Sequence, residues 1–245
     1  MDALIMAAGR GSRLGAHTDD RPKSLIDLGG ISPLELQIDV LASRGIERVL
    51  VVTGYRREDV VTAAIARAAG RLKVQPIWNP FWPVTNVIGS AWMAREHLTT
   101  SFVYLHADTV FEPTILDDLL ATPGDGVLPI DFRPCEPEQM KASVVDGRVT
   151  HLSKELGDGE TAGEFIGIGL FREPALGPVR AGLDAVLAEG TLNAYFEGAL
   201  NHAIDAGLDL RTVATAGRAW TEIDFEADLE LARSILPRLL PAAST

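Results

Sequence analysis

The chain has 245 residues, of which 47% are hydrophobic and 23% charged, and its 34 acidic and 22 basic residues give a net charge of −12. This is an ordinary globular composition with room for a sizeable core, and the acidic balance excludes an extended basic surface for nucleic acid. The single cysteine, Cys135, excludes a disulfide framework and a cysteine-based zinc cluster.

Strand and helix patterns alternate along the first half of the chain. Pro33, followed by Leu34, Ile38 and Leu41, predicts an amphipathic helix that closes near Gly45. Short apolar runs predict buried strands. The other elements predicted in this half are strands at 3–8, 48–53, 73–78 and 102–107 and a helix at 57–69. Such alternation is typical of βαβ units around a mainly parallel sheet.

The second half has a different pattern. Asp146-Gly147 suits the type I′ turn of a hairpin between strands at 142–145 and 148–152. Further predicted elements are strands at 165–171, 210–214 and 220–223 and helices at 174–188, 192–206 and 226–236. We expect one domain over 1–236, with a nucleotide-binding half at about 1–125 and an acceptor-binding half at about 126–236. The tail, 237–245, holds two prolines and small residues and is expected to fray.

The most informative segment is the glycine-rich loop, residues 7–15, which follows the first strand. Gly9 and Gly11 let the backbone approach a ligand without hindrance from a Cβ atom, and successive N–H groups can bind phosphate oxygens. Between Gly9 and Lys23 there are four basic and two acidic residues, a local charge of +2 within a chain of −12. The combination favours a phosphate-binding loop.

Two other interpretations of this loop stay open. A glycine-rich turn with solvated arginines needs no ligand. The spacing of Gly9, Gly11 and Gly15 is a loosened form of the Rossmann pattern G-x-G-x-x-G, but the second strand ends in Thr53-Gly54 without the acidic residue of a dinucleotide site. The G-x-x-x-x-G-K-[ST] pattern of a Walker A loop does not occur.

The segment Ala7-Ala8-Gly9-x-Gly11-Ser12-Arg13-Leu14, followed by Pro22-Lys23, resembles the signature of the nucleotidyltransferases that activate sugar phosphates and related phosphates. Within that superfamily the chain is most similar to the small cytidylyltransferases acting on phosphocholine or phosphonates. The motifs that carry this similarity are Asn86-x-Ile88-x-Ser90, Asp108, residues 163–167, Tyr195-Phe196-Glu197 and Glu222-Ile223-Asp224. The resemblance implies a three-layer α/β/α nucleotidyltransferase fold, Rossmann-like and of the GT-A type, with a mixed, mainly parallel central sheet.

The resemblance also implies how a nucleotide is bound. The loop backbone and Arg13 would hold the β- and γ-phosphates, and Lys23 would place a compact positive charge at the α-phosphate and its transition state. A solvated lysine is the alternative for Lys23. The catalytic residues implied are Lys23, Arg13 and Asp108, and the nucleotide-binding residues implied are Ala7, Ala8, Gly9, Gly11, Ser12, Arg13, Lys23, Asn86 and Ser90.

Two aspartates are candidates for a metal site. Magnesium takes hard oxygen ligands, usually one or two carboxylates plus substrate phosphates. Asp108 lies at the carboxyl end of an apolar strand, where open α/β sheets bind ligands. In the family that the chain resembles, aspartates matching Asp108 and Asp224 hold the catalytic Mg²⁺. The two are 116 positions apart, so spacing alone predicts no contact, and Asp224 can instead cap the last helix.

Asn86 and Ser90 begin an amphipathic helix, and their amide and hydroxyl groups suit the edge of a nucleobase. The resemblance places a cytosine there, while capping of the helix by Asn86 is an equally good interpretation. Some relatives have a second asparagine where this chain has Val87. The preference for CTP therefore rests mainly on the similarity to the cytidylyltransferases.

The acceptor site is expected in the second half of the chain. Its candidate residues are Asp131, Lys141, Lys154, Glu164, Tyr195, Glu197, Trp220 and Glu222. A choline head group would favour an aromatic cage with a nearby carboxylate, for which Trp220, Tyr195 and Glu222 are candidates. His106 is interpreted as a strand-end histidine whose hydrogen bonds are satisfied. The sequence does not decide between phosphocholine and a phosphonate.

The sequence as a whole predicts a Mg²⁺-dependent cytidylyltransferase that joins CMP from CTP to phosphocholine or a phosphonate and releases pyrophosphate. The alternatives are a sugar-1-phosphate nucleotidyltransferase using UTP or dTTP and a non-catalytic nucleotide sensor. No apolar run approaches the roughly 20 residues of a membrane span, and the N-terminus has no signal-peptide pattern. We therefore expect a cytoplasmic protein without membrane or nucleic-acid partners, with a homodimer as the commonest oligomer.

Overall fold

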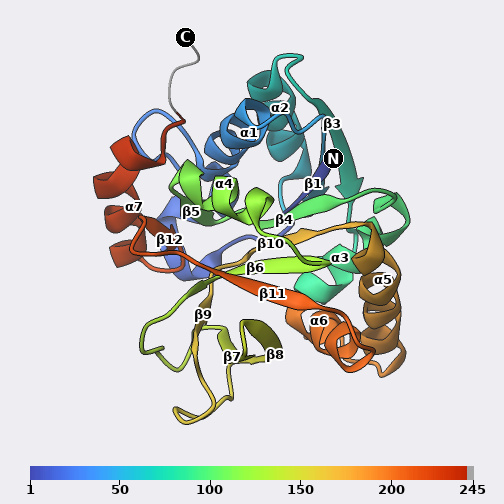
Figure 1. The fold of residues 1–245 in the computed structure, drawn as a ribbon. Coiled ribbons are helices and arrows are strands. Elements are labelled where there is room, and N and C mark those ends of the chain that lie inside the picture. Colours follow the sequence, from blue (N-terminus) through green and yellow to red (C-terminus); the bar gives the residue numbers. More distant parts are fainter. Residues whose placement is uncertain (242–245) are drawn as a thin grey trace.

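The computed structural model describes residues 1–241, which fold around a mixed sheet of ten strands in the order β11-β8-β7-β9-β6-β10-β4-β1-β2-β3 (Figure 1). Its strands are β1 (Asp2–Ala7), β2 (Arg48–Thr53), β3 (Lys73–Trp78), β4 (Phe102–His106), β6 (Gly126–Asp131), β7 (Lys141–Val145), β8 (Arg148–Ser153), β9 (Gly163–Phe165), β10 (Ile168–Phe171) and β11 (Leu210–Ala214). Strands β5 (Thr109–Phe111) and β12 (Trp220–Glu222) form a second, two-stranded sheet. The predicted α/β class and mixed, mainly parallel sheet are confirmed.

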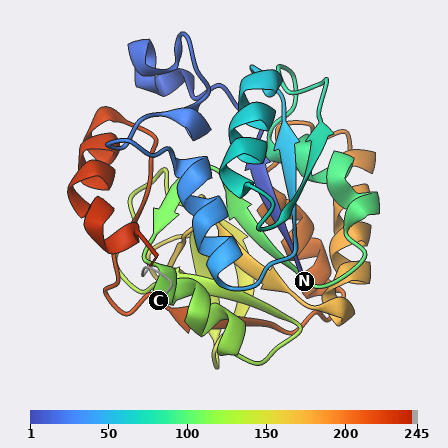
Figure 2. The ribbon, with the colours of Figure 1, turned by 90° about the horizontal axis from the view of Figure 1, so that it is seen from above.

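Helices cover both faces of the large sheet (Figures 1 and 2). The α-helices are α1 (Pro33–Ser43), α2 (Arg57–Ala68), α3 (Val87–Ala94), α4 (Pro113–Ala121), α5 (Glu173–Ala188), α6 (Phe196–Asp205) and α7 (Glu226–Leu239). Short 3₁₀ segments occupy Ser12–Thr18, Lys23–Leu25 and Arg95–His97. One core holds α1, α2 and α4 against the sheet, and the opposite core holds α3, α5 and α6. This is the three-layer arrangement expected.

Strand β1 shows why both faces must be covered. Leu4 and Met6 belong to the core with α3, α5 and α6, while Ala3, Ile5 and Ala7 belong to the core with α1, α2 and α4. A strand whose side chains are buried on both faces reads as a continuous apolar run. This strand pairs in parallel with β2 and with β4, so the carboxyl ends of β1 and β4 lie side by side at one edge of the sheet.

The second half of the chain extends the sheet with antiparallel neighbours. Strand β10 pairs antiparallel with β4 and with β6. Strands β6, β9, β7, β8 and β11 then close into a ring, because β11 pairs with both β8 and β6. The hairpin β7–β8 turns at Asp146 (φ 50°) and Gly147 (φ 74°), as the type I′ prediction requires.

Three predicted boundaries were wrong for identifiable reasons. The strand predicted at 165–171 is broken at Gly167 (φ 76°), where a Cβ atom would lie 2.6 Å from Nδ1 of His106. The helix predicted at 192–206 begins only at Phe196, since the carbonyl groups of Leu192 and Ala194 accept hydrogen bonds from the backbone N–H groups of Asn86 and Ile88. The helix predicted to end at 236 continues to Leu239.

Other elements were not predicted at all. Strands β5 and β6 and helix α4 escaped the sequence analysis, although α4 begins with Pro113 in the first turn. The predicted frayed tail is helical up to Leu239, and its last four positions, 242–245, lie outside the described residues.

Candidate active site

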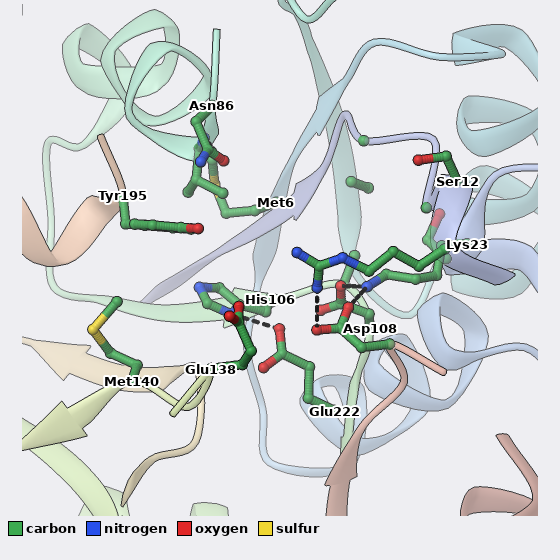
Figure 3. A pocket seen from close by; sticks show the side chains of 18 of the residues that line it. Met6, Ser12, Lys23, Asn86, His106, Asp108, Glu138, Met140, Tyr195 and Glu222 are labelled. Carbon is green, nitrogen blue, oxygen red and sulfur yellow. Dashed lines mark hydrogen bonds and ion pairs between the residues drawn. The ribbon is translucent and has the colours of Figure 1, made fainter. Parts of the chain in front are cut away.

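A pocket of about 340 Å³ opens at the carboxyl ends of β1 and β4 (Figure 3). This is the edge at which open α/β sheets bind ligands. Of the predicted site residues, those that line it are Ala7, Gly9, Gly11, Ser12, Arg13, Lys23, Asn86, Asp108, Lys154, Tyr195, Glu197, Glu222 and Asp224. Ala8 and Ser90 line a smaller adjoining cavity of about 90 Å³. Asp131, Lys141, Glu164 and Trp220 line neither of them.

The glycine-rich loop is shaped by its contact with Lys23. Gly11 has φ 80°, and a Cβ atom there would lie 2.5 Å from Cβ of Lys23. The backbone N–H of Lys23 donates to the carbonyl group of Arg10, and the hydroxyl group of Thr18 donates to that of Gly11. A glycine at position 11 is therefore required both by the left-handed backbone and by the close approach of Lys23.

The central feature of the site is Lys23, whose ammonium group lies between two carboxylates. Its Nζ is 2.5 Å from Oδ2 of Asp108 and 2.7 Å from Oδ1 of Asp224. Arg13 contacts the other oxygen of Asp224 at 3.0 Å. The structure thus brings together four residues that the sequence separates by up to 211 positions.

The charges of this cluster stabilise one another. Burial by itself lowers the pKa of Lys23, but Asp108, Asp224 and Glu222 outweigh it and hold that pKa above its ordinary value. Burial raises the pKa of Asp108, and the positive charges of Lys23 and His106 outweigh this and lower it. At neutral pH the cluster therefore contains ionised partners.

The same oxygens suit a divalent cation. Asp108 and Asp224 already share one cationic group, Nζ of Lys23, so their carboxylates form a site for positive charge. One ligand atom each of His106, Asp108 and Glu222 also lie within 4.8 Å of one another. Magnesium prefers carboxylate oxygen to imidazole nitrogen, so Asp108, with Asp224 or with Glu222, offers the oxygen donors that fit it.

His106 was interpreted as a satisfied strand-end histidine, and the structure gives it a more charged setting. Its Nδ1 is 3.5 Å from Oε1 of Glu222, and its Nε2 is 4.0 Å from Oε1 of Glu197. Burial lowers the pKa of His106, but the hydrogen bond and charge of Glu222, with Glu197 and Asp108, raise it to about 9. No sequence signal linked His106 to these glutamates, because Glu197 and Glu222 come from α6 and β12.

The side chain of Asn86 is engaged within the protein. Its Oδ1 accepts from the backbone N–H of Val87 at 2.8 Å and caps α3, and its Nδ2 donates to the carbonyl group of Asn193 at 3.2 Å. Both alternatives of the sequence analysis thus keep support, because Asn86 caps the helix and also lines the pocket. Ser90 lies one turn further along the same helix.

The aromatic residues of the predicted cage are each covered by a cation of the chain itself. Nζ of Lys154 lies 5.0 Å from the ring centroid of Tyr195. The guanidinium group of Arg133 lies 5.4 Å from the ring centroid of Trp220, whose indole N–H donates to Asp131. Trp220 does not line the pocket, so Tyr195 and Trp220 do not form the two walls of one cage.

Asp131 and Glu164 belong to an ion-pair network with Arg133, and Lys141 lies on the neighbouring strand opposite Glu164. Arg133 forms ion pairs of 2.8 Å with both Asp131 and Glu164. Burial raises the pKa of Glu164, the pair with Arg133 opposes it, and the result is a pKa of about 7. The ammonium group of Lys141 donates to the carbonyl group of Lys154 and holds the strand end that carries Lys154.

This raised pKa predicts a pH-dependent stability. The folded protein binds the Glu164 proton more tightly than the unfolded chain does. The contribution of this proton to the free energy of unfolding is therefore complete below the ordinary pKa of 4.5 and is lost as the pH rises through about 7. Glu164→Gln removes this titration. From pH 4.5 to about 7, we expect the free energy of unfolding of the variant to rise steadily relative to that of wild type. Urea unfolding at several pH values measures this difference.

The control for this prediction is Glu230→Gln, at an exposed position of α7. Its unfolding free energy should follow the wild-type pH profile. A Glu164→Gln profile that runs parallel to that of wild type would show that Glu164 titrates normally in the folded protein.

The sequence matches one family model and several characterised proteins. The family model described as "MobA-like NTP transferase domain" matches residues 3–154. The chain is 33% identical, over 91% of its length and 35% of the relative's, to CMP-5'-(3-aminopropyl)phosphonate synthase of Streptomyces rubellomurinus. It is 31% identical, over 96% of its length and 51% of the relative's, to the bifunctional IPC transferase and DIPP synthase of Rubrobacter xylanophilus. The chain thus spans between a third and a half of the length of these relatives.

Among solved structures, the CTP:phosphocholine cytidylyltransferase of Streptococcus pneumoniae superposes with a TM-score of 0.78, covering 96% of this chain and 98% of that one. At 22% sequence identity this likeness shows a shared fold. Among residues 1–241, no helix combines the length and the apolar character needed to cross a bilayer.

Proposed function

The chain belongs to the MobA-like NTP transferase domain family, and from this membership and its site we propose that it transfers CMP from CTP to a small phosphate or phosphonate acceptor, with Mg²⁺ as cofactor. The observation that carries the proposal is the cluster of Lys23, Asp108 and Asp224 beneath the glycine-rich loop. It provides a largely covered ammonium group and converging carboxylates at the edge where open α/β sheets bind ligands.

In the proposed reaction an acceptor oxygen attacks the α-phosphorus of CTP in line. The bond from that phosphorus to the oxygen bridging the α- and β-phosphates breaks, and pyrophosphate leaves with the bonding electron pair. The loop from Gly9 to Ser12 and Arg13 would hold the β- and γ-phosphates, and Lys23 would neutralise the charge that develops at the α-phosphate. Mg²⁺ held by Asp108 and Asp224 would supply further neutralisation of the phosphate charge.

The reaction asks no general base of the protein. A phosphate or phosphonate acceptor is largely anionic at neutral pH, because its second pKa is about 6. The chain's residues therefore contribute positioning and charge neutralisation. His106, positively charged below its pKa of about 9, would instead keep Glu222 and Glu197 in place at the acceptor side.

For the acceptor we propose an organic group that donates hydrogen bonds, such as a primary ammonium group, in preference to a quaternary ammonium group. Glu197 lines the pocket with 2% of its surface exposed, and both of its carboxylate oxygens lack a hydrogen-bond donor among the described residues. Such a buried acceptor favours a ligand that can donate to it. One face of Tyr195, to which a trimethylammonium group could bind, is taken by Lys154.

Pyrophosphate release tests this proposal. Each of CTP, UTP, dTTP and ATP is combined with 2-aminoethylphosphonate, 3-aminopropylphosphonate, phosphocholine and glucose 1-phosphate in the presence of Mg²⁺. We expect turnover with CTP and an aminoalkylphosphonate. The kcat/KM for phosphocholine should be lower by a factor of about ten or more. Turnover with UTP and glucose 1-phosphate but not with CTP would assign the protein to sugar activation instead. Nucleotide binding without turnover would indicate a sensor.

A further inference from the structure

Asn79 is a buried neighbour of Ser90, which lines the small cavity where the resemblance to nucleotidyltransferases implies a nucleobase. This cavity of about 90 Å³ adjoins the main pocket and is lined by Ala8, Gly9, Trp82 and Ser90, among others. Asn79 follows β3, is 1% exposed and does not line this cavity, but its side chain contacts Ser90, which does. No pattern in the sequence assigns a function to Asn79.

The amide group of Asn79 is fully used within the protein. Its Oδ1 accepts from the backbone N–H of Phe81 at 2.9 Å. Its Nδ2 donates to the hydroxyl oxygen of Thr85 at 3.2 Å and to that of Ser90 at 2.9 Å. The hydrogen-bond donors of Asn79 thus determine how two hydroxyl groups are oriented.

The hydroxyl groups of Thr85 and Ser90 differ in the hydrogen bonds that they form. The hydroxyl group of Thr85 accepts from Asn79 and donates to the carbonyl group of Phe81 at 3.0 Å, so it is satisfied. The hydroxyl group of Ser90 also accepts from Asn79, but among residues 1–241 no acceptor takes its own proton. Since one of its lone pairs is occupied, Ser90 meets a ligand in the cavity chiefly as a hydrogen-bond donor.

We propose that Asn79 is a positioning residue that fixes the Ser90 hydroxyl group as a donor toward the nucleobase. The inference rests on the proposed function and on the position of the base beside Asn86 and Ser90 that the resemblance to nucleotidyltransferases implies. The edge that would be recognised carries a carbonyl oxygen or an unprotonated ring nitrogen, as the O2 and N3 atoms of cytosine do. Asn86 contributes less to this recognition, because both ends of its amide are engaged by Val87 and Asn193.

The variant that tests this is Asn79→Asp. It keeps the size of the side chain and its bond from the N–H of Phe81, but it replaces the donor to Ser90 by an acceptor. The Ser90 proton would then turn toward the new carboxylate and away from the base. We expect the KM for CTP to rise about tenfold, with kcat and the KM for the acceptor within about twofold of wild type.

A double-mutant cycle with Ser90→Ala separates positioning from a structural contribution. Ser90→Ala alone should raise the KM for CTP by a similar factor, and adding Asn79→Asp to it should raise that KM no further. Melting temperatures of the four proteins show how much each change affects folding. An equal rise of KM on adding Asn79→Asp in both backgrounds would mean that Asn79 acts through the loop, and would overturn the inference.

The cycle can be read independently of the nucleotide that the enzyme prefers. If wild type is active with another pyrimidine triphosphate, the assignment of CTP fails while the coupling between Asn79 and Ser90 is still measured with that nucleotide. If no triphosphate binds wild type, as judged by calorimetry with each Mg²⁺ complex, the proposed function and this inference both fail.

Discussion

Asp108→Asn is expected to lower kcat by about 10²- to 10³-fold or more while the protein remains folded. Asparagine keeps the shape of the side chain and one oxygen beside Lys23. It removes the negative charge with which Asp108 pairs with the ammonium group of Lys23. Losing this charge removes the ion pair that orders the ammonium group of Lys23. It also removes the principal candidate ligand for Mg²⁺. Pyrophosphate release gives the rate, and circular dichroism gives the fold.

Asp117→Asn provides a matched control. Asp117 is a half-exposed aspartate on α4 that pairs with Arg44 at 2.9 Å and does not line the pocket. Removing an exposed ion pair costs at most about 1 kcal/mol, so kcat should be unchanged. An Asp108→Asn protein that fails to fold would mean that the aspartate is structural, and the metal assignment would be withdrawn.

Lys23→Met is expected to have two effects. It removes the charge proposed to act at the α-phosphate, so kcat should fall by about 10²- to 10³-fold. It also leaves Asp108 and Asp224 facing each other without their shared ammonium group, at a site where Lys23 is only 14% exposed. Breaking a fully buried ion pair costs about 3–5 kcal/mol; because this cluster is part-buried we expect a smaller loss, which should still lower the melting temperature.

The second effect is also a test of the cation site. Because Mg²⁺ can replace the missing positive charge, millimolar Mg²⁺ should raise the melting temperature of Lys23→Met more than that of wild type. Lys73→Met, at an exposed position of β3, should show neither effect. A Lys23→Met protein whose melting temperature does not respond to Mg²⁺ would show that Asp108 and Asp224 do not form a divalent-cation site.

The sequence predicted the bounds of β2, β3 and β11 to the residue, because each is a short segment rich in apolar and β-branched residues. It also predicted the glycine-rich loop and Lys23 as a unit, because their spacing along the chain is short. Here local pattern and structure coincide, since the hydrogen bonds and contacts involved join near neighbours in sequence, such as Lys23 with Arg10.

No local sequence pattern could predict that Asp108 and Asp224 lie close together. It depends on the two-stranded sheet, in which Thr109 pairs with Glu222, and on the N–H of Ile223 donating to the carbonyl group of Asp108. Strand β5 has three residues, too few to show an alternating pattern, and it was not predicted. Only the resemblance to nucleotidyltransferases suggested this pair, and no pattern suggested His106 or Asn79.

The central claim is that this site transfers CMP to the oxygen of a phosphonate or phosphate. Phosphorus NMR of a reaction with CTP, Mg²⁺ and 2-aminoethylphosphonate tests it most directly, because it identifies both products at once. The account predicts equal amounts of pyrophosphate and of an anhydride in which the phosphonate and the α-phosphate of CMP share one oxygen. Unchanged CTP, or its hydrolysis to free CMP with the phosphonate signal unaltered and with the same result for the other acceptors, would contradict it.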